Sequence, residues 1–264
     1  MGPTAYSHEH KLARALEYLK TYNRVAERWI NIHTTSPFFR IKSEICGQET
    51  RHIVYWDPIE ELPAVELGLL VGDFLHNLRC ALDHLAFELA SAYTVPLPAK
   101  AAETSEFPIF WKKPMNAGQE LSKIGCIHPE AVKLIKAIQP HHKGIKYTED
   151  SLWILNELER IDKHRALHIG FHQITKNDVV GTNMAIRSFN GVAPAEGLKK
   201  GAKMADFFVA RIDPNQPMHV DYRPSTTITL EPGLPLSGKP LGLGLRKIYD
   251  DIKRIAIVPL GRFL

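Results

Sequence analysis

The stretch GDFLHNLRCALDHLAFELA, residues 72–90, decides the fold, because it reads as one strongly amphipathic helix. Apolar side chains recur in it at spacings of three and four, the period of a helix with one buried stripe. These side chains are Phe74, Leu75, Leu78, Ala81, Leu82 and Leu85. The helix is expected to extend from about Pro63, which suits a first turn, to about Ala92. The pattern therefore predicts the long central helix of a helical bundle.

The elements on either side of this helix predict an α+β protein. Further helices are expected over residues 8–32, 129–138, 150–166 and 241–255. A hairpin is expected around Gly47, and four strand-like runs lie between residues 169 and 232. We expect residues 1–166 to form a mainly helical bundle with the hairpin and a long loop at 94–128. Residues 167–264 are expected to form a small antiparallel β-sheet plus a C-terminal helix, packed on the same body.

Composition narrows the class of protein. The 264 residues contain no apolar run near the roughly 18 residues that a membrane span needs, so no membrane association is expected. Cys46, Cys80 and Cys126 are few and widely spaced, which is typical of reduced thiols and predicts a cytoplasmic protein. The net charge of +4 permits an acidic partner such as RNA without requiring one.

The polar side of the central helix carries residue types that do chemistry. Between the apolar positions stand Asp73, His76, Asn77, Arg79, Cys80, Asp83 and His84. One interpretation is structural: Arg79 and Asp83 form an ion pair one turn apart, and the histidines contact neighbouring helices. The other is catalytic, because His titrates near neutrality and the planar guanidinium of Arg binds phosphate well.

The spacing Arg79-x4-His84 resembles the signature of the HEPN superfamily, helical-bundle proteins many of which are metal-independent ribonucleases. The resemblance implies RNA cleavage by the neighbouring 2′-hydroxyl, with His84 as general acid/base and Arg79 as phosphate clamp. Asp83 and His76 would support them, no cofactor would be needed, and the active form would be a homodimer. Cys80 departs from the pattern, because the family often has a polar residue such as Asn directly after the Arg.

A second resemblance covers more of the chain. The order GDFLHNLRCALDHL, EFPIF, QP and LWILNELERIDKHR is similar to a widespread group of uncharacterised bacterial proteins. This similarity implies a stand-alone domain that spans most of the chain, and implies nothing about its chemistry.

Substrate contacts are predicted at the end of the helix over residues 150–166. The candidates are Asn77 on the central helix and Asp162, Lys163, His164 and Arg165 on this one. In a ribonuclease Asp162 would orient His84 or pair with Arg79, while Lys163 and Arg165 would hold phosphate. The structural alternative is that the cations of the last turn complement the helix dipole.

Two other functions stay open on the residues alone. His76, Cys80 and His84 recur at every fourth position, so one pair could join His164, Asp162 or His168 in a metal-dependent hydrolase. The chain could equally be a non-catalytic binding or interaction protein that uses the polar helix face as an anchor. The leading hypothesis, the ribonuclease, has no metal ligand.

Overall fold

The computed structural model describes residues 6–33, 38–116, 118, 122–165, 167–191 and 199–264. The chain divides into two compact units, each assembled from separate stretches of sequence. The helical unit comprises residues 1–23, 68–167 and 242–264, and the sheet unit comprises residues 24–67 and 168–241. The hairpin thus shares a unit with the later strands, and the C-terminal residues share one with the central helix. The α+β class predicted from the sequence is confirmed.

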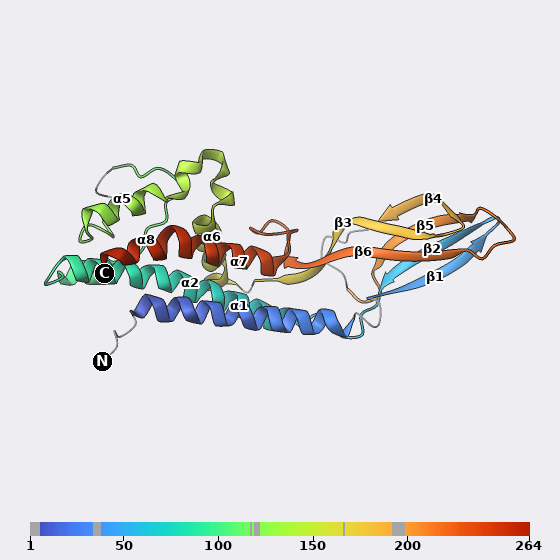
Figure 1. Cartoon of the computed structure of the whole chain (residues 1–264), viewed down its shortest axis with the longest axis horizontal. Coiled ribbons are helices and arrows are strands. Elements are labelled where there is room, and N and C mark those ends of the chain that lie inside the picture. Colours follow the sequence, from blue (N-terminus) through green and yellow to red (C-terminus); the bar gives the residue numbers. More distant parts are fainter. Residues whose placement is uncertain (1–5, 34–37, 117, 119–121, 166, 192–198) are drawn as a thin grey trace. The chain divides into compact units, whose positions relative to one another are not determined.

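The helices lie close to their predicted positions (Figure 1). They are α1 (Ser7–Ile32), α2 (Ala64–Tyr93), α3 (Ala99–Thr104), α5 (Pro129–Ala137), α6 (Ser151–His164), α7 (Leu241–Ile252) and α8 (Val258–Leu260). There are also two 3-10 helices, η1 (Pro140–Glu149) and η3 (Gly261–Phe263), and a π-helical turn, η2 (Lys253–Ile257). Among the described residues, no helix is both long and apolar enough to cross a membrane.

The predicted apolar stripe of α2 forms the core of the helical unit. Its six members, Phe74, Leu75, Leu78, Ala81, Leu82 and Leu85, are all fully buried. The N-terminal half of α1 lies beside α2 and runs in the opposite direction (Figure 1). At its start Ser7 contacts His84, and His8 pairs with Glu88, one turn further along α2. Burial of this continuous stripe is the main source of stability for α2, since apolar area removed from water contributes about 25 cal/mol per Å².

The C-terminal end of α6 approaches α2 at two glycines. A Cβ atom at Gly68 would lie 2.9 Å from the backbone oxygen of Leu167, and one at Gly72 would lie 2.5 Å from Oδ2 of Asp162. Only glycine permits this close approach of the two segments. At its other end α6 begins at an N-cap, where the Asp150 carboxylate accepts hydrogen bonds from the amides of Leu152 and Trp153. These features set which face of α6 meets α2.

The sheet unit contains two antiparallel sheets. Four strands pair in the order β1 (Phe39–Cys46), β2 (Glu49–Trp56), β5 (Lys203–Arg211) and β4 (Met184–Gly191), while β3 (Ile169–Thr182) pairs with β6 (His219–Leu230). The predicted hairpin is β1–β2, and its turn contains Gly47 with φ of 65°. Tyr222 of β6 stacks on Phe207 and meets Phe39 edge-on, so an aromatic core lies where the two sheets meet.

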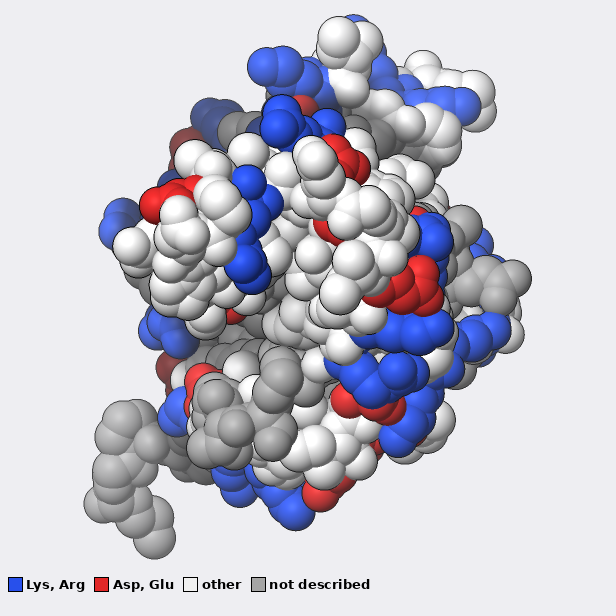
Figure 2. All heavy atoms as spheres, turned by 90° about the vertical axis from the view of Figure 1, so that its right-hand side faces the viewer, with Lys and Arg blue, Asp and Glu red and all other residues white. Residues whose placement is uncertain are grey.

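The basic residues of the sheet unit are interspersed with acidic ones. Arg51 and Lys203 both contact Asp206 at 2.6 Å, and the Arg51 hydrogen bond, with Lys203, holds the pKa of that carboxyl at about 2. Figure 2, which faces the strand end of Figure 1, shows an uncharged surface bordered by Lys and Arg with Asp and Glu among them. Paired charges of this kind are typical of a solvated sheet face.

Candidate functional site

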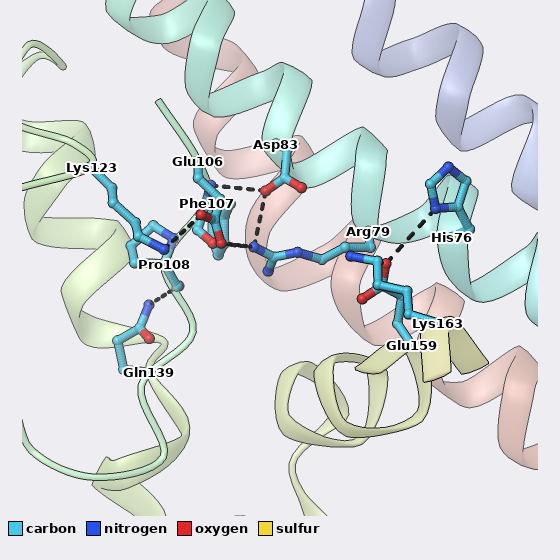
Figure 3. Close-up of polar contacts among 10 residues, drawn as sticks. All are labelled: His76, Arg79, Asp83, Glu106, Phe107, Pro108, Lys123, Gln139, Glu159 and Lys163. Carbon is cyan, nitrogen blue, oxygen red and sulfur yellow. Dashed lines mark hydrogen bonds and ion pairs between the residues drawn. The ribbon is translucent and has the colours of Figure 1, made fainter. Parts of the chain in front are cut away.

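The polar side chains of α2 fall into three groups with different partners. Arg79 and Asp83 reach toward the segment after α3, His84 contacts the start of α1, and His76 and Cys80 face α6. We call the first group the clamp and define it as Arg79, Asp83 and Glu106 with the backbone of Phe107 (Figure 3). The predicted catalytic residues are therefore divided among separate surroundings.

Arg79 is the centre of the clamp, and its side chain is only 7% exposed. Its Nη2 lies 3.0 Å from Oδ1 of Asp83, and donates to Oε1 of Glu106 at 2.9 Å and to the carbonyl of Phe107 at 2.8 Å. Nη1 is buried and has no hydrogen-bond partner among the described residues. The ion pair with Asp83 is the one that the structural interpretation of the sequence predicted. The guanidinium is thus enclosed by acceptors of its own chain.

The charges of the clamp balance once Lys123, which contacts Glu106, is included. Glu106 lies between two cations, since its other oxygen accepts a hydrogen bond from Lys123 Nζ at 2.6 Å. Burial raises the pKa of Glu106, but the hydrogen bond and charge of Lys123, together with Arg79, outweigh it and lower that pKa. Burial raises the pKa of Asp83, against the opposing effects of Arg79 and the Phe107 amide. Two carboxylates therefore compensate two cations, and no positive charge is left over for an anionic ligand.

Segment 106–110 is held through its backbone. The amide of Phe107 donates to Oδ1 of Asp83 at 3.0 Å, and the amide of Phe110 donates to Oε1 of Gln139 at 2.8 Å. Gln139 Nε2 donates in turn to the carbonyl of Pro108 at 3.1 Å. Side chains of Arg79, Asp83 and Gln139 thus satisfy an extended segment that pairs with no strand among the described residues. Phe107 itself is fully buried.

His84 does not share these contacts. It is half-buried, and its Nδ1 forms a hydrogen bond with Oγ of Ser7 at the first turn of α1. Within the described part of the chain, no hydrogen bond or ion pair joins His84 to Arg79. Asn77 is also occupied, because its side-chain amide donates to the carbonyl of Asp73 one turn earlier in α2, at 2.8 Å.

The predicted substrate-binding residues of α6 have diverse surroundings. Asp162 faces α2 as one alternative expected, but it lies against Gly72, and burial raises its pKa. Lys163 pairs with Glu159 of its own helix at 2.6 Å. His164 and Arg165 are exposed at the end of α6. Among the described residues, no group of three or more His, Cys, Asp or Glu side chains is arranged to hold a metal ion.

Sequence reasoning gave no role to Glu106, Gln139 or Glu159. The burial of Glu159 could have been predicted, because it stands at a position of α6 where the helical spacing expects a buried apolar residue. The stripe is Leu152, Leu155, Glu159 and Asp162, at steps of three, four and three. An acidic residue on a core stripe indicates a buried charge with a partner. Nothing local distinguishes Glu106 or Gln139, since their roles depend on α2 and on segment 106–110.

Comparison with protein-family models, with curated proteins and with solved structures finds no match for this chain. The interpretation of the polar face of α2 consequently rests on its geometry.

Proposed function

We propose that this chain is a non-catalytic interaction protein, in which the polar face of α2 stabilises the helical unit and a partner binds along the sheet unit. The observation that supports the proposal is the state of Arg79. Its guanidinium is buried, and the Nη2 atom contacts two carboxylates and a carbonyl of the same chain. A phosphate clamp needs donors that are open to substrate. Arg79 instead anchors segment 106–110.

The second candidate is the HEPN-like, dimeric ribonuclease expected from the Arg79–His84 spacing. One observation favours it: His84 is half-buried and lies on the same helix as Arg79. Its mechanism would require segment 106–110 to leave Arg79, because substrate would otherwise meet Glu106 before the guanidinium. That displacement would expose Phe107, which is fully buried.

An RNA cleavage assay separates the two candidates. Wild type is incubated with labelled single-stranded and structured RNA in EDTA, beside Arg79→Ala and His84→Ala. We expect no cleavage above the buffer control from any of the three proteins, because the Arg79 guanidinium is buried and presents no exposed donor to phosphate. EDTA-resistant cleavage by wild type that disappears in folded His84→Ala would contradict the interaction proposal and establish the ribonuclease.

The edge strand β1 is the surface that we assign to the partner. It pairs with β2 on one side, and no described strand pairs on the other. Ile41 and Ile45 share one face of β1, and the Ile45 side chain is 86% exposed. Arg40 and Lys42 are more than half exposed on the opposite face, where they form surface ion pairs with Asp57 and Glu44. Such surface pairs contribute little, so a partner's carboxylates can replace them. An open edge with exposed apolar residues is a template for strand addition. The partner is therefore an extended polypeptide segment with apolar and acidic residues in alternation.

A peptide that alternates Val with Glu over ten residues tests this assignment. We expect saturable binding to wild type and slower hydrogen exchange of the β1 amides in the complex. Ile45→Lys should weaken binding at least tenfold, since burying an Ile side chain contributes about 1.5–3 kcal/mol. Ile212→Lys is the matched control, because Ile212 is 68% exposed just beyond β5. Absence of binding, or equal losses in both variants, would exclude β1 as the docking edge.

A further inference from the structure

Three side chains form a row between α2 and α6, outside the clamp. Cys80 and His76 lie one turn apart on the open side of α2, with Cys80 Sγ 3.5 Å from His76 Nε2. The other ring nitrogen, Nδ1, faces Oε1 of Glu159 on α6 at 3.8 Å (Figure 3). The His76 side chain is 55% exposed, whereas that of Glu159 is only 7% exposed. The order is thus thiol, imidazole and buried carboxylate.

Glu159 is the unusual member of this row. Its Oε1 is buried and has no hydrogen-bond partner among the described residues, although Lys163 Nζ forms an ion pair with it at 2.6 Å. A buried carboxylate normally has its lone pairs satisfied by donors. Here one lone-pair region is turned toward the imidazole of His76. An imidazolium formed at that position would be a second positive partner for Glu159, beside Lys163.

The Cys80 thiol lies in mixed electrostatic surroundings. Burial raises its pKa most; among the charges, Lys11 of α1 and Lys163 of α6 lower it, while Asp83 of α2 and Glu159 of α6 raise it. The net effect is a raised pKa, so the thiol is protonated at neutral pH. A thiol in that state is a poor nucleophile unless a neighbouring base removes its proton. His76 is the base within reach.

We propose that Cys80 is a nucleophilic thiol, activated by His76 and supported by Glu159, that forms a covalent bond with carbon electrophiles carrying a leaving group. In the reaction the S–H proton passes to His76 Nε2 as the sulfur lone pair forms the S–C bond. The leaving group departs with the electron pair of its bond to carbon. The imidazolium faces Glu159, which acts as a positioning residue. The proposal is independent of the partner at β1.

Iodoacetamide is the probe, with iodide as the leaving group, and alkylation of each cysteine is followed by mass spectrometry from pH 6 to 10. Alkylation of the exposed Cys46 is the internal reference for reagent activity, and alkylation of the half-buried Cys126 reports on unfolding. At pH 7 we expect His76→Gln to slow alkylation of Cys80 at least tenfold relative to Cys46. In His76→Gln the alkylation rate of Cys80 should increase only at alkaline pH, because burial has raised the pKa of the thiol.

Two further variants separate activation from structure. Glu159→Gln should slow the alkylation of Cys80 several-fold and shift the pH dependence of that rate. If Glu159 had only a structural role, its replacement would not shift the pH dependence. His10→Gln is the matched control, because His10 is exposed on α1, and it should leave the Cys80 rate within a factor of two. The proposal fails if Cys80 reacts at the same rate in wild type and His76→Gln while Cys126 stays protected, or if their pH profiles coincide.

Discussion

Replacing Arg79 by methionine is expected to lower the free energy of unfolding of the helical unit by about 3 kcal/mol. The side chain keeps most of the buried stem, so the loss comes from the guanidinium and not from packing. Asp83 and Glu106 then lose their common cation, and the carbonyl of Phe107 loses its donor. This loss is at the low end of the range for breaking a buried ion pair, because Glu106 is partly exposed. Native-state hydrogen exchange of the α2 amides measures the loss.

The control for Arg79 is Arg14, which pairs with Glu17 on the surface of α1. Both side chains are more than half exposed, so Arg14→Met should change stability far less than Arg79→Met. If Arg79→Met cost no more than Arg14→Met, the clamp would contribute little to stability. A non-catalytic, structural role for Arg79 would then lose its physical basis.

Replacing Gln139 by methionine is expected to cost about 2 kcal/mol, the second largest effect. The two side chains have similar volume, but methionine neither donates to the carbonyls of Pro108 and Ile135 nor accepts from the amide of Phe110. Gln139 is buried, so water does not replace the lost bonds, and each unsatisfied group costs about 1–3 kcal/mol before relaxation.

The exchange rate of the Phe110 amide provides the specific measurement for Gln139. This amide should exchange faster in Gln139→Met than global destabilisation alone explains, because its acceptor is gone. Lys133→Met is the control on the preceding helix, α5, where Lys133 is exposed and pairs with Glu130. We expect a change within about 0.5 kcal/mol for this control. An unchanged Phe110 rate in Gln139→Met would disprove the role assigned to that side chain.

Much of the fold could be predicted from the sequence, because helix periodicity is a local property. The six-residue stripe of α2 and the hairpin at Gly47 needed only the spacing of apolar side chains and a turn residue. The pairing of β2 with β5 could not be predicted in this way. It joins segments about 155 residues apart, and its register depends on which faces the complete sheet buries.

The candidate site was less predictable, for a related reason. The residue types on α2 indicated chemistry, but the direction of each side chain depends on what packs against it. Arg79 meets Glu106, which is 27 residues away along the chain, while His76 meets Glu159. The Arg79–Asp83 pair was the one contact that local spacing predicted. The ribonuclease role inferred from the Arg79–His84 spacing stays a prediction.

The way in which segment 106–110 is held has a consequence for how the helical unit recognises polypeptide. Asp83, Arg79 and Gln139 bind amides and carbonyls, which every residue type presents. The side chains of the segment that are also bound are the Glu106 carboxylate and the buried Phe107 ring. The segment is therefore held against the helices mainly through its backbone, in the manner of a tethered peptide. Its affinity is intramolecular, so the chain is its own competitor for any extended peptide that would enter there.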